Sequence, residues 1–155
     1  MKCAEYKVSM VRECELEYKA KLRDSSTVID FWHAEIEKAS WYDSEKEMCV
    51  VVLLSAKNHI KGYNLVSIGS INSSIVAPRE VFRPAIIGGA VAVILCHNHP
   101  SGDTTPSAED IRITKQLVEA GKIVDIGVLD HVIVSNASNE SKGYTSLRET
   151  GVVEF

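Results

Sequence analysis

The chain has 155 residues, of which 45% are hydrophobic and 25% are charged, and its formal net charge is −4. This size and composition predict a single domain, over residues 1–155, with one sizeable hydrophobic core. The longest apolar run, Ala85–Cys96, is too short to span a bilayer, and the N-terminus lacks the apolar stretch of a secretory signal, so we expect a cytoplasmic protein without a membrane partner.

Hydrophobic patterns predict alternating strands and helices in the first half of the chain. Apolar and polar residues alternate over 13–19, which favours a half-exposed strand. Ser25-Ser26 is expected to cap a helix that runs to about Ser40 and turns four apolar side chains inward, those of Val28, Phe31, Trp32 and Ile36. Further elements are predicted as strands near 47–55 and 59–69 and a short helix from Arg79 to about Ile87.

The second half of the chain predicts a buried strand, a helix and another strand. Ala90–Cys96 is a continuous apolar run, typical of a strand that is buried on both faces. Thr105 is the expected N-cap of the next helix, with Pro106 at its first position and Gly121 just beyond its end. A last strand is predicted near 123–134.

Residues that could bind a metal ion follow the buried strand directly. His97 and His99 lie two residues apart at the end of this strand, so both side chains leave the same face. Ser107 and Asp110 share the first turn of the next helix, which can fold back and bring Asp110 to the histidines. Two imidazoles and one carboxylate, with a fourth position open to water, form the ligand set of a catalytic zinc site.

A plainer interpretation of the same residues is a helix cap. Ser107-x-x-Asp110 fits a capping box, in which the serine caps the helix and the acid reaches back. Taken alone, this interpretation would be preferred. The conjunction of His-x-His-Pro, a six-residue gap and Ser-x-x-Asp after a buried strand favours the metal site.

The same conjunction resembles the JAMM motif of the JAB/MPN metallopeptidase superfamily. Within it, HNHPSG…PSAED, together with PREVF at 78–82 and LDHVIV at 129–134, is similar to the RadC family. The resemblance implies a cytidine-deaminase-like α/β sandwich around a mixed sheet. It also implies that His97, His99 and Asp110 are the metal ligands and that Ser107 stabilises the oxyanion.

The family also has an upstream glutamate as general base, for which the chain offers two candidates. Glu47 opens the apolar run Met48–Leu54, which resembles the family's strand. Glu80 lies at a helix start, where the helix dipole favours an acid without any catalytic duty. A general base should be fixed on a rigid element beside the reacting water, so Glu47 is preferred.

These residues predict a JAMM-type zinc hydrolase that cleaves a peptide or isopeptide bond in a peptide or protein substrate. The alternative is a nonenzymatic or partner-dependent role in DNA repair, although the net negative charge and the absence of a Lys/Arg cluster argue against direct nucleic-acid binding. A nucleobase deaminase would need His-x-Glu and Pro-Cys-x-x-Cys, which the chain lacks. Whether Asp130-His131 supports the site or only the core is left open, as is the oligomeric state.

Overall fold

The computed structural model describes residues 4, 7–11, 21–22, 24–69, 76–135 and 143–155. A five-stranded mixed sheet has the strand order β2-β1-β3-β4-β5. Strands β3 and β4 pair in parallel, and all other neighbouring strands in this sheet pair antiparallel. The strands are β1 (Met48–Leu54), β2 (Ile60–Ile68), β3 (Ala92–His99), β4 (Gly127–Ser135) and β5 (Tyr144–Ser146). The helices are α1 (Ser25–Phe31), followed by the π-helical turn η1 (Trp32–Ile36), α2 (Pro78–Ile87) and α3 (Ala108–Val124). The α/β class is confirmed.

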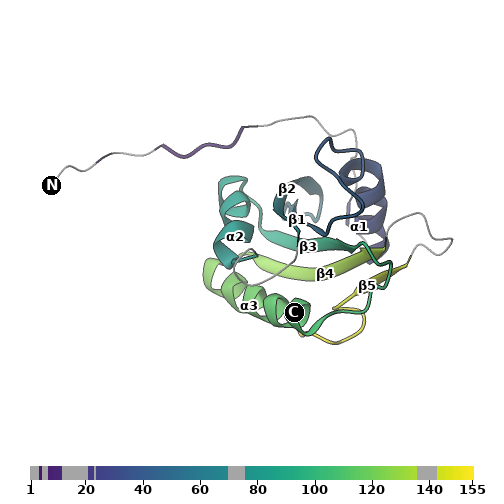
Figure 1. Ribbon diagram of the computed structural model, residues 1–155. Coiled ribbons are helices and arrows are strands. Elements are labelled where there is room, and N and C mark those ends of the chain that lie inside the picture. The colour runs from purple at the N-terminus through teal and green to yellow at the C-terminus, as the bar shows by residue number, and fades with distance from the viewer. Residues whose placement is uncertain (1–3, 5–6, 12–20, 23, 70–75, 136–142) are drawn as a thin grey trace.

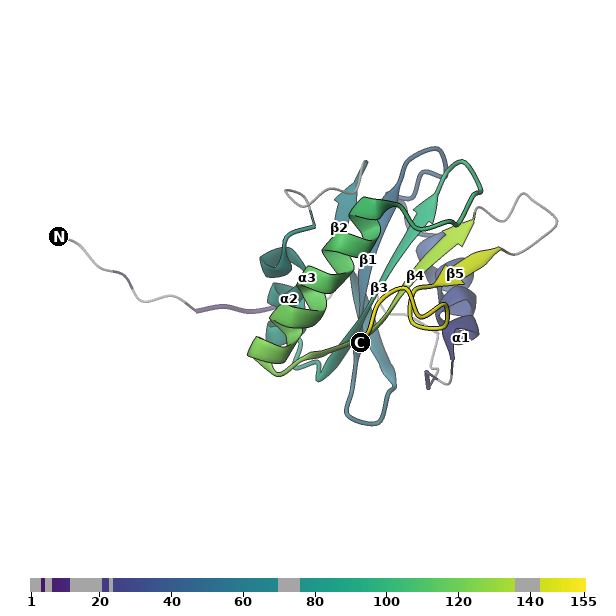
Figure 2. The same cartoon turned by 90° about the horizontal axis from the view of Figure 1, so that it is seen from below.

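Helices cover both faces of the sheet. Helices α2 and α3 lie on one face and α1 lies on the other (Figures 1 and 2). Strand alternation sends Val51 and Leu95 into the core beneath α2 and α3, and Val50 and Ile94 into the core beneath α1 and η1. Because the central strands β1 and β3 are buried on both faces, the ends of these strands are held rigidly.

The first helix differs from its prediction at both ends. Asp24 is the N-cap, and its carboxylate accepts a hydrogen bond from the backbone N–H of Thr27 at 3.1 Å. The α-helix ends at Phe31, and the chain widens into η1, where Glu37 N donates to Trp32 O at 3.0 Å. The predicted inward-facing residues are all buried. The strand predicted at 13–19 lies outside the described residues.

Helix α3 also differs from its prediction at both ends. Ser107 is the N-cap, so the prediction of Thr105 as the cap and Pro106 as the first helical residue is wrong. The helix continues past Gly121 to Val124, and Asp125 takes the left-handed conformation that ends it. Gly121 is instead required by packing, because a Cβ there would lie 2.6 Å from the carbonyl oxygen of Ile126.

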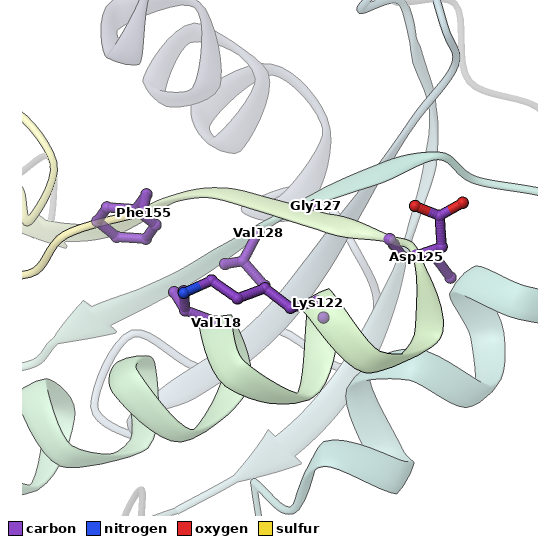
Figure 3. Close-up of a pocket in the computed structure, with 8 residues that line it drawn as sticks. Val118, Lys122, Asp125, Gly127, Val128 and Phe155 are labelled. Carbon is purple, nitrogen blue, oxygen red and sulfur yellow. The ribbon is translucent and has the colours of Figure 1, made fainter.

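A pocket lies where α3 turns into β4 (Figure 3). It is lined by Val118, Gly121, Lys122, Asp125, Ile126, Gly127, Val128 and Phe155. Since β3 and β4 are parallel and Gly127 pairs with Ala92, this pocket adjoins the start of β3, whereas the two histidines lie at its end. Among the described residues, no helix has the length and apolar character needed to cross a bilayer.

Candidate metal centre

Three segments that are distant in sequence bring the candidate ligands together. His97 and His99 end β3, Asp110 lies in the first turn of α3, and Glu47 immediately precedes β1. Because β1 and β3 are antiparallel with Cys49 opposite His97, two steps along each strand from that pair lead to Glu47 and His99. The sheet register therefore places Glu47 beside the two histidines.

The four side chains form a compact group. One ligand atom from each of Glu47, His97, His99 and Asp110 lies within 4.8 Å of all the others. His97 Nε2 lies 3.0 Å from His99 Nε2 and 3.5 Å from Asp110 Oδ1, and His99 Nε2 lies 3.7 Å from Asp110 Oδ2. Glu47 Oε1 lies 3.7 Å from His97 Nε2 and 3.8 Å from His99 Nε2.

The spacing of these atoms fits a tetrahedral metal ion. Ligand atoms about 2.0–2.1 Å from a tetrahedral zinc ion would lie about 3.3 Å from each other. The separations of 3.0, 3.5 and 3.7 Å among His97, His99 and Asp110 bracket this value. The group could therefore hold a metal ion with little movement of its side chains.

A hydrogen bond to the backbone orients the ring of His99. His99 Nδ1 lies 2.5 Å from the carbonyl oxygen of Asp103, and because a carbonyl can only accept, the ring donates from Nδ1. Its Nε2 then faces the group. The nearby Asp110 carboxylate raises the pKa of His99.

The group lies at the boundary between the core and the surface. The side chains of His97 and Asp110 are 0% and 3% exposed, while those of His99 and Glu47 are 16% and 23% exposed. Burial holds the pKa of His97 well below its usual value, which leaves this ring neutral and able to act as a ligand. Burial alone would raise the pKa of Asp110, but the nearby imidazoles of His99 and His97 and the hydrogen bonds from Ser107 lower it.

Asp110 belongs to a capping box and to the candidate metal group at the same time. Its Oδ2 accepts from Ser107 N at 2.8 Å and from Ser107 Oγ at 2.6 Å, and Ser107 Oγ accepts from Asp110 N at 3.1 Å. The two interpretations of Ser-x-x-Asp are therefore compatible. The Ser107 hydroxyl gives its hydrogen to Asp110 in this structure, and its role at an oxyanion stays a prediction.

Glu80 lies outside the group. It occupies the first turn of α2, where its carboxylate pairs with Arg79 at 2.9 Å and Arg83 at 3.4 Å. Of the two acids considered as the base, the structure brings Glu47 to the histidines. The assignment of Glu47 as the base remains a prediction.

Asp130 and His131, whose roles the sequence left open, point to different parts of the protein. His131 is fully buried, and its Nε2 lies 2.8 Å from His97 Nδ1. Asp130 instead accepts hydrogen bonds from Ser25 Oγ at 3.1 Å and Ser146 Oγ at 2.6 Å, which tie α1 and β5 to β4. Only His131 of this pair contacts a member of the candidate group through its side chain.

Two buried cysteines flank the group without joining it. Cys49 lies opposite His97 in the sheet, and burial raises the pKa of its thiol far above the usual value. Cys96 packs in the core beneath α1, on the opposite face of the sheet from Cys49. Both thiols are free and protonated.

Comparison with known proteins gives consistent matches over most of the chain. The model of a family described as "RadC-like JAB domain" matches residues 22–152. A UPF0758 protein of Desulfitobacterium hafniense is 47% identical over 124 residues, which cover 80% of this chain and 52% of the relative. A UPF0758 protein of Caldanaerobacter subterraneus is 53% identical over 110 residues, which cover 71% of this chain and 45% of the relative. A UPF0758 protein of Methanosarcina mazei is 46% identical over 112 residues, which cover 72% of this chain and 47% of the relative. The chain thus spans about half the length of these curated relatives.

Proposed function

The chain belongs to the family of RadC-like JAB domains, and from that membership and its candidate metal centre we propose that it is a zinc-dependent hydrolase of the JAMM type. The proposed reaction is hydrolysis of a peptide or isopeptide bond in a peptide or protein. The observation that carries the proposal is the convergence of Glu47, His97, His99 and Asp110 at the end of the sheet.

In this proposal the two histidines and Asp110 hold the ion, and Glu47 is the general base. Two imidazole nitrogens and a carboxylate oxygen suit zinc. His97 and Asp110 are the most buried members and are fixed by the strand and the capped helix. Glu47 is the most exposed member, which leaves its carboxylate accessible to water and substrate.

The chemistry requires one proton to move twice. A zinc ion held by these residues would supply acidification of the attacking water, lowering its pKa from about 15.7 toward 7. The Glu47 carboxylate takes a proton from the attacking water as the water oxygen bonds to the carbonyl carbon. When the carbon–nitrogen bond breaks, Glu47 returns this proton to the leaving amine, so the products are a carboxylic acid and an amine.

Ser107 is proposed to stabilise the negative charge that develops on the carbonyl oxygen. Ser107 is an exposed residue at the start of α3, and its hydroxyl donates to Asp110 Oδ2 at 2.6 Å. The proposed role therefore requires the hydroxyl to turn its hydrogen toward the substrate during the reaction. A donor of this kind contributes about 2.7–4 kcal/mol to stabilisation of the transition state.

The proposal is tested by combining metal analysis with a cleavage assay. The purified full chain is analysed for bound metals and incubated with a mixed peptide library and with an isopeptide-linked protein conjugate. New termini are identified by mass spectrometry. We expect about one zinc per chain, and cleavage that stops when zinc is chelated and returns when zinc is added.

The controls separate loss of the ion from loss of the fold. His97→Ala is expected to abolish zinc binding and cleavage while the circular dichroism spectrum is kept, because the two cores are built from buried hydrophobic side chains. His59→Ala, an exposed residue outside the group, should leave both unchanged. Absence of bound zinc after zinc addition and dialysis would contradict the proposed centre, and cleavage that persists in His97→Ala would contradict the proposed mechanism.

A further inference from the structure

A chain of buried hydrogen bonds connects His97 to the backbone of α3. Thr114 Oγ1 lies 2.6 Å from the carbonyl oxygen of Asp110 and 2.5 Å from His131 Nδ1. The other ring nitrogen of the same histidine, His131 Nε2, lies 2.8 Å from His97 Nδ1. His97, His131 and Thr114 are each at most 1% exposed, so water does not compete for these bonds.

The backbone carbonyl at one end determines the direction of the first bonds. A carbonyl oxygen can only accept, so Thr114 must give its single hydroxyl hydrogen to Asp110 O. In the contact with His131 the hydroxyl oxygen is then the acceptor. His131 therefore carries its hydrogen on Nδ1.

The same reasoning determines where His97 carries its hydrogen. A neutral imidazole has one N–H and one lone pair, so His131 with its hydrogen on Nδ1 offers a lone pair at Nε2. This lone pair accepts from His97 Nδ1 across 2.8 Å. His97 Nε2 is left with a lone pair, and it is this atom that faces His99 and Asp110.

We propose that Thr114 and His131 are positioning residues that hold His97 in the tautomer with its hydrogen on Nδ1, so that the lone pair of Nε2 points into the candidate metal centre. This inference rests on the proposed zinc site. Neither residue touches the reacting atoms. Each acts through His97, in the way that outer partners of ligating histidines fix ring orientation.

The opposite tautomer of His97 would be disfavoured by its neighbours. With its hydrogen on Nε2, the ring would present a lone pair at Nδ1 to the lone pair of His131 Nε2 at 2.8 Å. If His131 instead carried its hydrogen on Nε2, its Nδ1 and the Thr114 oxygen would be two acceptors 2.5 Å apart. The chain therefore selects one tautomer before any ion arrives.

The test uses the tautomer itself and the affinity for zinc, both measured without a substrate. Thr114→Val removes the hydroxyl while keeping the branched shape, Thr114→Ser restores the hydroxyl, and His131→Phe removes both nitrogens. Thr150→Val is a matched control, because the Thr150 hydroxyl makes the same type of bond to Ser146 O at 2.8 Å outside this chain of bonds. Long-range proton–nitrogen NMR of the zinc-free protein identifies the protonated nitrogen of His97, and competition with a chromophoric chelator gives the zinc dissociation constant.

We expect wild type, Thr114→Ser and Thr150→Val to show His97 with its hydrogen on Nδ1. Thr114→Val and His131→Phe should show a mixture of tautomers and bind zinc about 10- to 100-fold more weakly, the usual effect of losing an outer partner of a ligand. Wild-type His97 with its hydrogen on Nε2, or equal zinc affinities in Thr114→Val and Thr114→Ser, would overturn the inference. If wild type binds no zinc, the proposed function fails and the NMR result still decides the inference.

Discussion

Asn98 on β3 holds the backbone of Met48 on the neighbouring strand β1, because Met48 N donates a hydrogen bond to Asn98 Oδ1 at 2.8 Å. Asn98 Nδ2 donates in turn to the carbonyl oxygen of Lys46 at 3.0 Å. These two backbone groups flank Glu47. The residue between the two histidines thus fixes the chain on both sides of the proposed base.

Asn98→Ala should therefore lower both stability and activity. The change leaves the buried Met48 N–H without its acceptor, which costs about 1–3 kcal/mol in the free energy of unfolding. It also frees Glu47 to move, so the rate of cleavage should fall while zinc stays bound. Urea denaturation and zinc analysis check these effects. Asn64→Ala, at an exposed position of β2, is the control and should change stability by less than about 0.5 kcal/mol.

Replacing Glu47 and Glu80 in turn by glutamine shows which of the two acids is the general base. Glu47→Gln keeps the shape but removes the proton acceptor, so the cleavage rate should fall by about 10²- to 10⁴-fold with zinc still bound. Glu80→Gln should leave the rate nearly intact and cost at most about 1 kcal/mol of stability. Steady-state kinetics on both variants decide between them. A dead Glu80→Gln with an active Glu47→Gln would show that the base is misassigned.

The two roles of Asp110 can be separated by a pair of substitutions. Asp110→Asn keeps an oxygen for the Ser107 bonds and removes the charge, so it should weaken zinc binding strongly with a small effect on stability. Ser107→Ala removes the cap and should cost about 0.5–2 kcal/mol in the free energy of unfolding. Zinc competition and urea denaturation on both proteins measure the two effects. Full zinc affinity in Asp110→Asn would argue that this carboxylate is no ligand.

The zinc-free protein should lose stability in mild acid. Burial lowers the pKa of His131 to about 4, below the value of 6.5 that applies in the unfolded chain. Protonation therefore favours unfolding, and stability that is full above about pH 6.5 declines toward pH 4, where the loss from this residue reaches about 3 kcal/mol. Urea denaturation between pH 7 and pH 4 gives the slope. His131→Phe should flatten it, and an unchanged slope in this variant would contradict the assignment.

The isolated chain should bind duplex DNA only weakly. Its net charge is −4, so there is little general electrostatic attraction between the chain and the phosphates of DNA. At physiological salt we expect a dissociation constant no tighter than the range of about 10⁻⁴ to 10⁻⁶ M that is typical of nonspecific binding. Fluorescence anisotropy with a labelled duplex measures it. Submicromolar, salt-sensitive binding would favour the alternative role in DNA metabolism.

Much of the fold could be predicted because apolar patterns report burial directly. The runs that form β1 and β3 are continuous, and the structure buries both strands on both faces. Helix ends were harder to predict. If Thr105 were the N-cap, the residue three positions later would be Ala108, whose side chain cannot accept a hydrogen bond from the cap's backbone N–H. Ser107, in contrast, exchanges such hydrogen bonds with Asp110.

The supporting residues of the centre could not be predicted from spacing. Thr114 and His131 are 17 residues apart, and they meet because α3 packs on β4. Asn98 lies between two motif residues, and its polar side chain within a buried strand indicates that it has hydrogen-bond partners, although not which ones. Such contacts depend on tertiary packing, which a pattern along one chain does not encode.

The protonated Cys49 thiol opposite His97 has a consequence for the chemistry of oxidation. Oxidants attack thiolates at accessible positions, and Cys49 is fully buried with its pKa held far above the usual value. The Cys49 sulfur is therefore shielded from peroxide. The proposed centre has only nitrogen and oxygen ligands. We therefore expect it to keep its activity under oxidising conditions that inactivate enzymes with thiolate-bound zinc.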